Sequence, residues 1–183
     1  MNQTILIRKE TPEDYAWVVE LTRRAFESMP FSEGNEDQLV VNFHKSESFI
    51  SELSLVAELN GQVVGHILFT PLFIENGPRH FESLVLAPVS VLPEWQNQGV
   101  GSLLIEAGHQ KAKELGFNSI ILVGHEHYYP RFGYKTASRW GIKVPFDLPS
   151  DDVFMALELT SDALAGCSGM VRFPAAFGLP GEK

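Results

Sequence analysis

The first quarter of the chain changes from strand-like to helix-like spacing of its apolar residues. Residues 4–8 alternate polar and apolar side chains, which predicts a β-strand. Thr11, followed by a proline, has the residue type of a helix N-cap, and apolar residues recur at helical spacing over residues 12–28. A second helix is predicted from about residue 35 to residue 45, after a loop over residues 29–34. The start of the chain therefore predicts one strand and then two helices.

Two long apolar runs in the middle of the chain predict a β-hairpin. The runs cover residues 53–59 and 62–74, and Asn60–Gly61 between them is a dipeptide favoured in two-residue hairpin turns. A third apolar run over residues 81–92 predicts another strand. Pro88 interrupts this strand, and because proline has no N–H to donate to a ladder, we expect a bulge or a sheet edge there.

An amphipathic helix is predicted over residues 99–115. Its apolar residues recur on one face, and Gly116 follows it as a residue type that ends helices. The mostly apolar run over residues 119–123 then predicts a buried strand. Two strands joined through one helix normally pair in parallel, so we expect residues 81–92 and 119–123 to form a βαβ unit.

The last third of the chain predicts further strands and a packed C-terminal extension. Two strands are expected over residues 135–143 and 153–160, and a short one over residues 170–173. The last of these lies in the extension, residues 162–183. Together the elements predict an α+β (mixed α/β) fold, with a twisted mixed sheet and flanking helices, in one domain over residues 1–183.

Composition and charge narrow the class of protein. The 183 residues are 44% hydrophobic, enough for one substantial core. No apolar run reaches the roughly 18 residues of a membrane span, and residues 1–10 lack the basic-then-apolar pattern of a signal peptide, so we expect a cytoplasmic protein that binds no membrane. Cys167 stands alone, which excludes an internal disulfide. The net charge of −9 argues against nucleic-acid binding and favours cationic amines as substrates.

The segment Val89–Ser102 joins an apolar strand to the predicted helix through a turn that contains two glycines. N–H groups at a helix start have no intrahelical acceptor and lie at the positive end of the helix dipole, so they suit a pyrophosphate. Gly99 and Gly101 let the backbone approach such a ligand. A P-loop would need a lysine followed by serine or threonine where this chain has Ser102–Leu103, and a dinucleotide fingerprint would need glycine at Leu104. Both alternatives are therefore excluded.

Three segments together resemble the GNAT superfamily of acetyl-CoA-dependent N-acetyltransferases. The first is Gln96-x-x-Gly99-x-Gly101 after its strand, and the second is Tyr128–Tyr134, which looks like the family's Phe-Tyr-x-x-x-Gly-Phe signature. The tail segment 166–177 further resembles the YhbS-like branch. The resemblance implies a GNAT-like fold with a splayed pair of strands at the cofactor site, acetyl-CoA as cosubstrate and a primary amine as acceptor.

The resemblance also implies which residues bind and react. Tyr129 matches the family's tyrosine that protonates the departing CoA thiolate. The strand backbone is expected to pair with the pantetheine arm, the turn to hold the pyrophosphate, and the loop over residues 29–34 to border the acceptor's entrance. The residues expected to bind acetyl-CoA are Val89, Ser90, Val91, Gln96, Asn97, Gln98, Gly99, Val100, Gly101 and Ser102.

One position departs from the family's pattern. Some members carry a glutamate as general base where this chain has Val85, and Glu82 falls on the other face of a regular strand. His125, Glu126 and His127 are the candidates to relay a proton through water, and no metal site is expected. Two functions therefore stay open: an N-acetyltransferase for an amine of a small molecule or protein, and a CoA-binding regulatory module with little transferase activity. An exposed strand edge and the apolar tail favour a homodimer.

Overall fold

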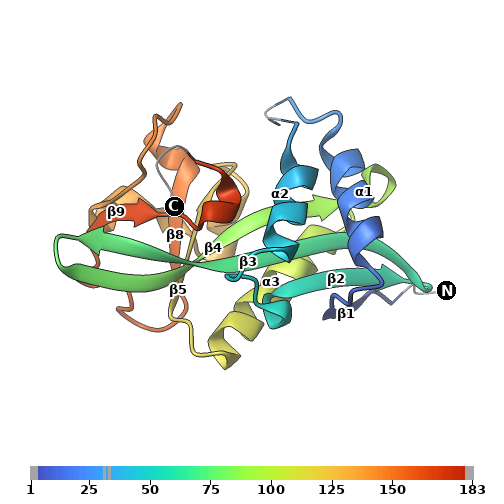
Figure 1. Ribbon diagram of the computed structural model, residues 1–183, viewed down its shortest axis with the longest axis horizontal. Helices are drawn as coiled ribbons and strands as arrows, with labels where there is room; N and C mark the ends of the chain where they lie inside the picture. The colour runs from blue at the N-terminus through green and yellow to red at the C-terminus, as the bar shows by residue number, and fades with distance from the viewer. Residues whose placement is uncertain (1–3, 31, 33, 180–183) are drawn as a thin grey trace. The chain divides into compact units, whose positions relative to one another are not determined.

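The computed structural model describes residues 4–30, 32 and 34–179 (Figure 1). None of the helices among these residues is long and apolar enough to cross a membrane. The α-helices are α1 (Tyr15–Phe26), α2 (Glu36–His44) and α3 (Val100–Glu114). The strands are β1 (Leu6–Lys9), β2 (Ser54–Leu59), β3 (Gln62–Asn76), β4 (Arg79–Val91), β5 (Ser119–Val123), β6 (Lys135–Thr136), β7 (Ile142–Lys143), β8 (Phe154–Glu158) and β9 (Gly169–Arg172).

The chain forms two compact units. The first comprises the residues up to Phe69 together with Ala87–Lys111, and the second comprises Thr70–Leu86 together with Ala112 and the residues after it. Strands β3 and β4 and helix α3 each contribute residues to both units. The single domain expected from the sequence stays a prediction.

The strands of the first unit pair in an antiparallel order. β1 pairs with β2, and β2 pairs with β3 through the hairpin. Asn60 and Gly61 join β2 to β3 with positive φ values of 51° and 80°, the conformation that Asn-Gly favours in a two-residue turn. The predicted hairpin is therefore confirmed.

Helices α1 and α2 lie side by side above β2 and β3 in the view of Figure 1, and α3 runs behind these strands and extends below them. Two hydrogen bonds attach α1 to the strands. Trp17 donates from Nε1 to the carbonyl oxygen of Val63 on β3 at 2.8 Å. Ser90 on β4 donates from Oγ to Thr22 Oγ1 on α1 at 3.1 Å. The end of β4 is thereby fixed against α1.

Helix α3 packs closely on β3 through two glycines. A Cβ atom at Gly65 would lie 3.0 Å from both Leu104 Cδ1 and Val100 Cγ1, which leaves no room for a larger residue without movement. A Cβ atom at Gly108 would overlap the ring of Phe69. The two glycines therefore permit the close approach of the helix and the strand.

A buried polar cluster lies in the first unit. The Glu10 side chain is fully buried, and its carboxylate accepts hydrogen bonds from Ser54 Oγ and, at 3.1 Å, from His44 Nε2. His66 Nε2 lies 2.9 Å from Ser54 Oγ. Burial alone would raise the pKa of Glu10, but its contacts with His44, His66 and Ser54 outweigh burial and lower that pKa to about 2. The cluster therefore holds a carboxylate in the interior.

We expect this cluster to make the fold sensitive to acid. A carboxylate whose pKa is lower in the folded chain than in the unfolded chain stabilises the fold above the unfolded pKa, and this contribution is lost as the pH falls toward the folded pKa. For Glu10 the window runs from its ordinary value of 4.5 down to about 2. The contribution at stake is about 3 kcal/mol.

Urea unfolding at neutral pH and at successive values through that window measures this effect. The wild-type protein should lose stability across the window, and the Glu10→Gln variant should lose markedly less because its amide does not titrate. If both proteins lose stability equally, the acid sensitivity comes from other groups.

The second unit contains the parallel step that the strand-helix-strand pattern predicts. β4 pairs in parallel with β5, with Leu84 opposite Ile120 and Val85 opposite Ile121. β8 pairs antiparallel with both β5 and β6, and β9 pairs antiparallel with β3 and in parallel with β7. The registered pairing of β4 with β5 is short compared with the length of either strand.

The C-terminal extension contributes to the core of the second unit. Val171 and Phe173 are buried, and the ring of Phe173 lies 5.0 Å from the ring of Phe177. The predicted short strand is confirmed as β9. Residues 180–183 of the extension lie outside the described residues.

The start of α1 differs from the prediction. The helix begins at Tyr15, and Asp14 rather than Thr11 precedes it. The Asp14 carboxylate accepts hydrogen bonds from Thr11 N–H at 2.9 Å and from Thr11 Oγ1 at 3.0 Å, and it pairs with Arg8 at 2.7 Å. Because the Thr11 hydroxyl donates to this turn, it does not cap the helix, and the predicted N-cap is wrong.

The prediction of one continuous strand over residues 135–143 is also wrong, because the structure has two short strands there. β6 ends at Thr136, and a 3-10 segment, η4 (Ala137–Trp140), follows before β7. Ala137 is fully buried, and Gly141 ends the segment with a φ of 74°. Glycine adopts this left-handed conformation without strain, so the chain turns there instead of continuing as one strand.

Candidate active site

The turn between β4 and α3 presents backbone N–H groups that donate to no acceptor among the described residues. A 3-10 segment, η2 (Pro93–Trp95), follows β4, and the backbone then takes positive φ values of 59° at Asn97 and 87° at Gly99. The first helical hydrogen bond runs from Leu103 N–H to the carbonyl oxygen of Gly99 at 3.1 Å. The N–H groups of residues 100–102 therefore precede the intrahelical ladder, at the positive end of the helix dipole. This geometry suits an anion such as a pyrophosphate.

Two glutamine side chains brace this turn. Gln96 donates from Nε2 to the carbonyl oxygen of Val91 at 3.0 Å, and Gln98 donates from Nε2 to that of Glu94 at 2.9 Å. Arg24 on α1 also pairs with Glu94 at 3.2 Å. The side chains of Gln96 and Gln98 therefore hold the shape of the turn, a role that the motif alone does not reveal.

Gly99 is required for its backbone conformation. Its φ of 87° is one that residues with a side chain rarely adopt. A Cβ atom at this position would meet no described atom within 4 Å. A side chain at position 99 would therefore be strained and would project into open space at the turn.

The strand residues expected to pair with the pantetheine arm alternate in burial. Ser90 is buried and faces α1, whereas Val89 and Val91 point to the other face and are half-buried. Leu92 follows them and donates from its N–H to the carbonyl oxygen of Val64 on β3 at 2.9 Å. The end of β4 is thus fixed from the side of β3 as well as from α1.

Tyr129 lies in a tight turn of the second unit. It begins the 3-10 segment η3 (Tyr129–Phe132), which ends at Gly133 with a φ of 93°. The rings of Tyr128 and Tyr134 stand nearly perpendicular to the Tyr129 ring, with centroid distances of 5.2 Å and 5.7 Å. The Tyr-Tyr-Pro-Arg-Phe-Gly-Tyr segment therefore packs its tyrosines around Tyr129.

The Tyr129 ring packs directly against the backbone of Gly124. A Cβ atom at Gly124 would lie 2.5 Å from Cε2 and 3.0 Å from Cδ2 of Tyr129. The Gly124 N–H donates to the carbonyl oxygen of Val153 at 2.9 Å, which fixes this stretch of backbone. The sequence does not predict this role. A glycine after a strand can be required for the conformation of a turn or to leave room for an aromatic ring, and the sequence does not distinguish the two.

The Tyr129 phenol is held in its protonated form. Burial raises its pKa, and the neighbouring Tyr128 raises that pKa further. None of the hydrogen bonds within the described residues involves the Tyr129 hydroxyl. The hydroxyl thus keeps a proton that it can donate to a ligand.

The other candidate groups differ in burial and in their contacts. Val85 is buried in the core of the second unit, and Glu82 is exposed. Glu126 and His127 form an ion pair at 3.4 Å, with the His127 side chain 94% exposed. In the loop over residues 29–34, residues 31 and 33 lie outside the described residues. The family's glutamate therefore has no counterpart on β4.

Comparison with known proteins identifies the class. Residues 51–136 match the acetyltransferase (GNAT) domain family. The chain is 35% identical over 129 residues to the N-acetyltransferase YjhQ of Escherichia coli K12, an alignment that covers 70% of this chain and 71% of YjhQ. The chain therefore belongs to the GNAT family of N-acetyltransferases.

Two further comparisons cover nearly the whole chain. YhbS of the same E. coli strain is 28% identical over 170 residues, which is 92% of this chain and 96% of YhbS. The crystal structure of E. coli YhbS in complex with CoA has a TM-score of 0.87 at 27% identity and covers all of this chain and 96% of that one. A GNAT family acetyltransferase from Brucella melitensis in complex with acetyl-CoA has a TM-score of 0.77 at 33% identity, covering 95% and 98%. The predicted GNAT fold is confirmed.

Proposed function

We propose that this N-acetyltransferase uses acetyl-CoA as its cosubstrate and acetylates a primary amine of a small molecule or protein by direct attack. The observation that carries the proposal is the braced turn before α3, whose N–H groups at residues 100–102 precede the first helical hydrogen bond. Phosphate groups bind at such helix starts. The relatives YhbS and the Brucella acetyltransferase, which bind CoA and acetyl-CoA, support the same ligand.

The proposed contacts divide acetyl-CoA between two stretches of backbone. The turn over residues 96–102 binds the pyrophosphate through main-chain N–H groups, with Gln96 and Gln98 acting as braces rather than as ligands. The backbone of Val89 and Val91 pairs with the amides of the pantetheine arm as a neighbouring strand would.

The reaction follows from the charges that develop in it. The neutral amine nitrogen attacks the thioester carbonyl carbon, a C–N bond forms, and the C–S bond to CoA breaks. The nitrogen loses one proton to solvent or base, and the CoA sulfur gains one. We assign the second proton to the Tyr129 hydroxyl, because its raised pKa keeps it protonated and because the role requires a donor at the sulfur. We assign no strand carboxylate to the first proton, since Val85 occupies that position.

Titration calorimetry and a thiol-release assay test the proposal. The protein should bind acetyl-CoA with micromolar affinity, and thiol release should depend on an added amine or basic peptide. Binding without release would favour a CoA-binding regulatory module, for which the valine at position 85 is the supporting observation. Failure to bind acetyl-CoA would overturn the assignment of the turn. Cytoplasmic location and a homodimer stay predictions.

A further inference from the structure

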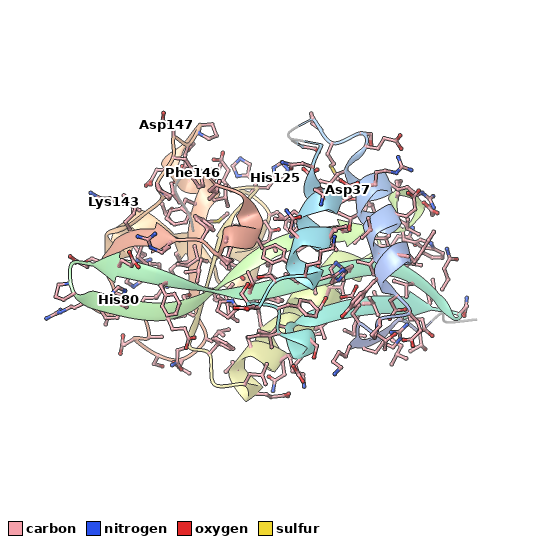
Figure 2. All side chains as sticks on the ribbon, viewed as in Figure 1. Asp37, His80, His125, Lys143, Phe146 and Asp147 are labelled. Carbon is pink, nitrogen blue, oxygen red and sulfur yellow. The ribbon has the colours of Figure 1, made fainter. Side chains whose placement is uncertain are left out.

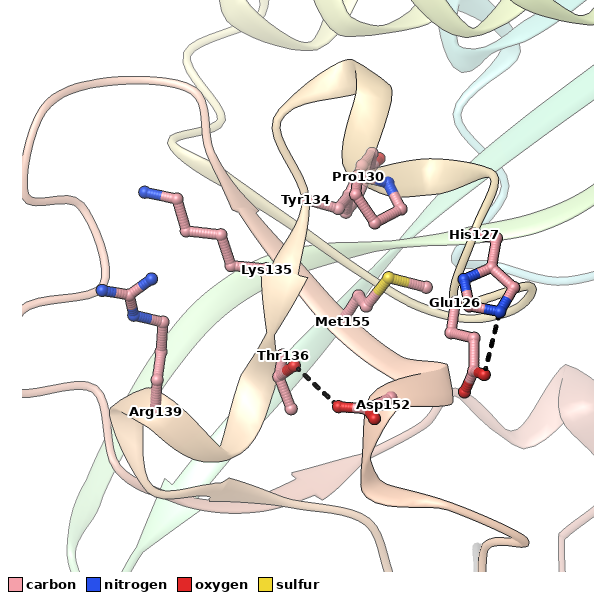
Figure 3. Close-up of a pocket in the computed structure, with 9 residues that line it drawn as sticks. All are labelled: Glu126, His127, Pro130, Tyr134, Lys135, Thr136, Arg139, Asp152 and Met155. Carbon is pink, nitrogen blue, oxygen red and sulfur yellow. Dashed lines mark hydrogen bonds and ion pairs between the residues drawn. The ribbon is translucent and has the colours of Figure 1, made fainter.

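A pocket of about 590 Å³ lies in the second unit beside the segment that carries Tyr129 (Figure 3). Its lining comes from three stretches of chain: residues 126–130, residues 134–139 and residues 152–155. Tyr134, whose ring packs against Tyr129, and Met155 line it and are both nearly fully buried. A volume of this size holds a small organic molecule.

One wall of the pocket carries two cations without acidic partners. Lys135 and Arg139 both line it, and Figure 3 shows their charged ends together on the left. Within the part of the chain that the structure describes, neither forms an ion pair. The Arg139 guanidinium lies over the ring of Trp140 at 5.2 Å, which limits its orientation. Both side chains are exposed, and two cations on one wall of a pocket suit an anionic group of a ligand.

Two carboxylates lie on the other side of the same pocket. Figure 3 places Glu126 and Asp152 to the right of the cations. Among the described residues, Glu126 forms an ion pair only with the exposed His127, and Asp152 accepts a long hydrogen bond from Thr136 Oγ1 at 3.4 Å. Both carboxylates are therefore weakly engaged. The separation of the charges suits a ligand with an ammonium group at one end and an anionic group at the other.

We infer that this pocket binds the acceptor, and that the acceptor is a zwitterionic amine of the amino-acid or short-peptide class. Lys135 and Arg139 bind its carboxylate, and its apolar body lies over Met155. Glu126 and Asp152 bind its ammonium group, which loses a proton to water before the neutral nitrogen attacks. A monocarboxylate fits better than a phosphate, because the two acids of the pocket balance its two cations. This inference rests on the proposed function only in assigning the ligand the role of acetyl acceptor. The ligand specificity of the pocket does not depend on CoA.

Calorimetry with a matched pair of dipeptides tests the pocket directly. Leucyl-leucine carries a free carboxylate, and leucyl-leucinamide has the same amine and side chains without it. We expect the acid to bind at least about tenfold more tightly than the amide, the effect of a lost charge-assisted contact. The double variant Lys135→Met/Arg139→Gln should abolish this preference. Lys143→Met, which removes an exposed lysine on β7 outside the pocket (Figure 2), should retain it.

Acetyl transfer to the same dipeptides, followed by thiol release, separates this inference from the proposed function. A lower KM for the acid that the double variant loses supports the inference. Equal binding of acid and amide, or a preference that survives in the double variant, overturns it even if other amines are acetylated. If the dipeptide binds with the expected preference and another amine is acetylated while the dipeptide is not, the pocket is no acceptor site. If no amine is acetylated at all, the proposed function fails. The binding preference for acid over amide still tests which class of ligand the pocket binds.

Discussion

Tyr129→Phe is expected to lower kcat by about a hundredfold or more, the usual effect of losing a general acid. Phenylalanine keeps the ring on Gly124 and against Tyr134 and removes only the proton donor. The affinity for acetyl-CoA should therefore stay nearly unchanged. Thiol-release kinetics measure kcat, and calorimetry measures the affinity.

Tyr128→Phe is the matched control, because it removes a hydroxyl from the adjacent residue of the same turn. It should leave kcat within a few-fold of the wild-type value. A Tyr129→Phe enzyme with wild-type kcat would remove this tyrosine from the mechanism.

Gly124→Ala gives an independent test of the same acid. The added Cβ displaces the Tyr129 ring, so kcat should fall with the acetyl-CoA affinity retained. Because Gly124 acts through Tyr129, the double variant Gly124→Ala/Tyr129→Phe should be no slower than Tyr129→Phe alone. An additional loss in the double variant would show that Gly124 has another role.

Gly99→Glu should weaken acetyl-CoA binding by at least about tenfold, from electrostatic repulsion and backbone strain together. The φ of 87° is unfavourable for any residue with a Cβ atom, and the carboxylate would project at the turn that presents its N–H groups to phosphate. Calorimetry with acetyl-CoA measures the change. Undiminished affinity would refute the assignment of this turn.

Gly116→Glu is the matched control for that variant. Gly116 follows the other end of α3, has a φ of 89°, and, like Gly99, meets no described atom within 4 Å of an added Cβ. The control therefore introduces the same strain and the same charge. It should lower the thermal stability and leave acetyl-CoA affinity unchanged.

The elements that the sequence predicts best are those specified by neighbouring residues. Asn60–Gly61 dictates a hairpin turn by itself, and residues 119–123 form β5 with the predicted bounds. The Thr11 N-cap fails because the Thr11 hydroxyl donates to the Asp14 carboxylate, which Arg8 also pairs with. Local residue types thus predict the end of an element well only where no charged side chain nearby forms a competing hydrogen bond with the capping residue.

The features that the sequence does not predict depend on contacts between residues far apart in the chain. Gly108 packs against the Phe69 ring, and Ser54 donates a hydrogen bond to Glu10. No periodic pattern in the sequence relates the two members of either pair. The position of the turn proposed to bind acetyl-CoA is recognisable from its glycines. Its bracing by Gln96 and Gln98 is not, since a glutamine in a turn motif looks the same whether it binds a ligand or a carbonyl of its own chain.

The bracing of that turn changes the step at which its conformational entropy is lost, folding or ligand binding. Gln96 and Gln98 fix the backbone through bonds made entirely within the chain, so much of the cost of ordering the turn falls on folding and less of it on association. A receptor ordered in this way keeps more of its gross interaction energy as affinity. In the proposed complex, side chains that need never touch acetyl-CoA thereby influence how tightly it is held.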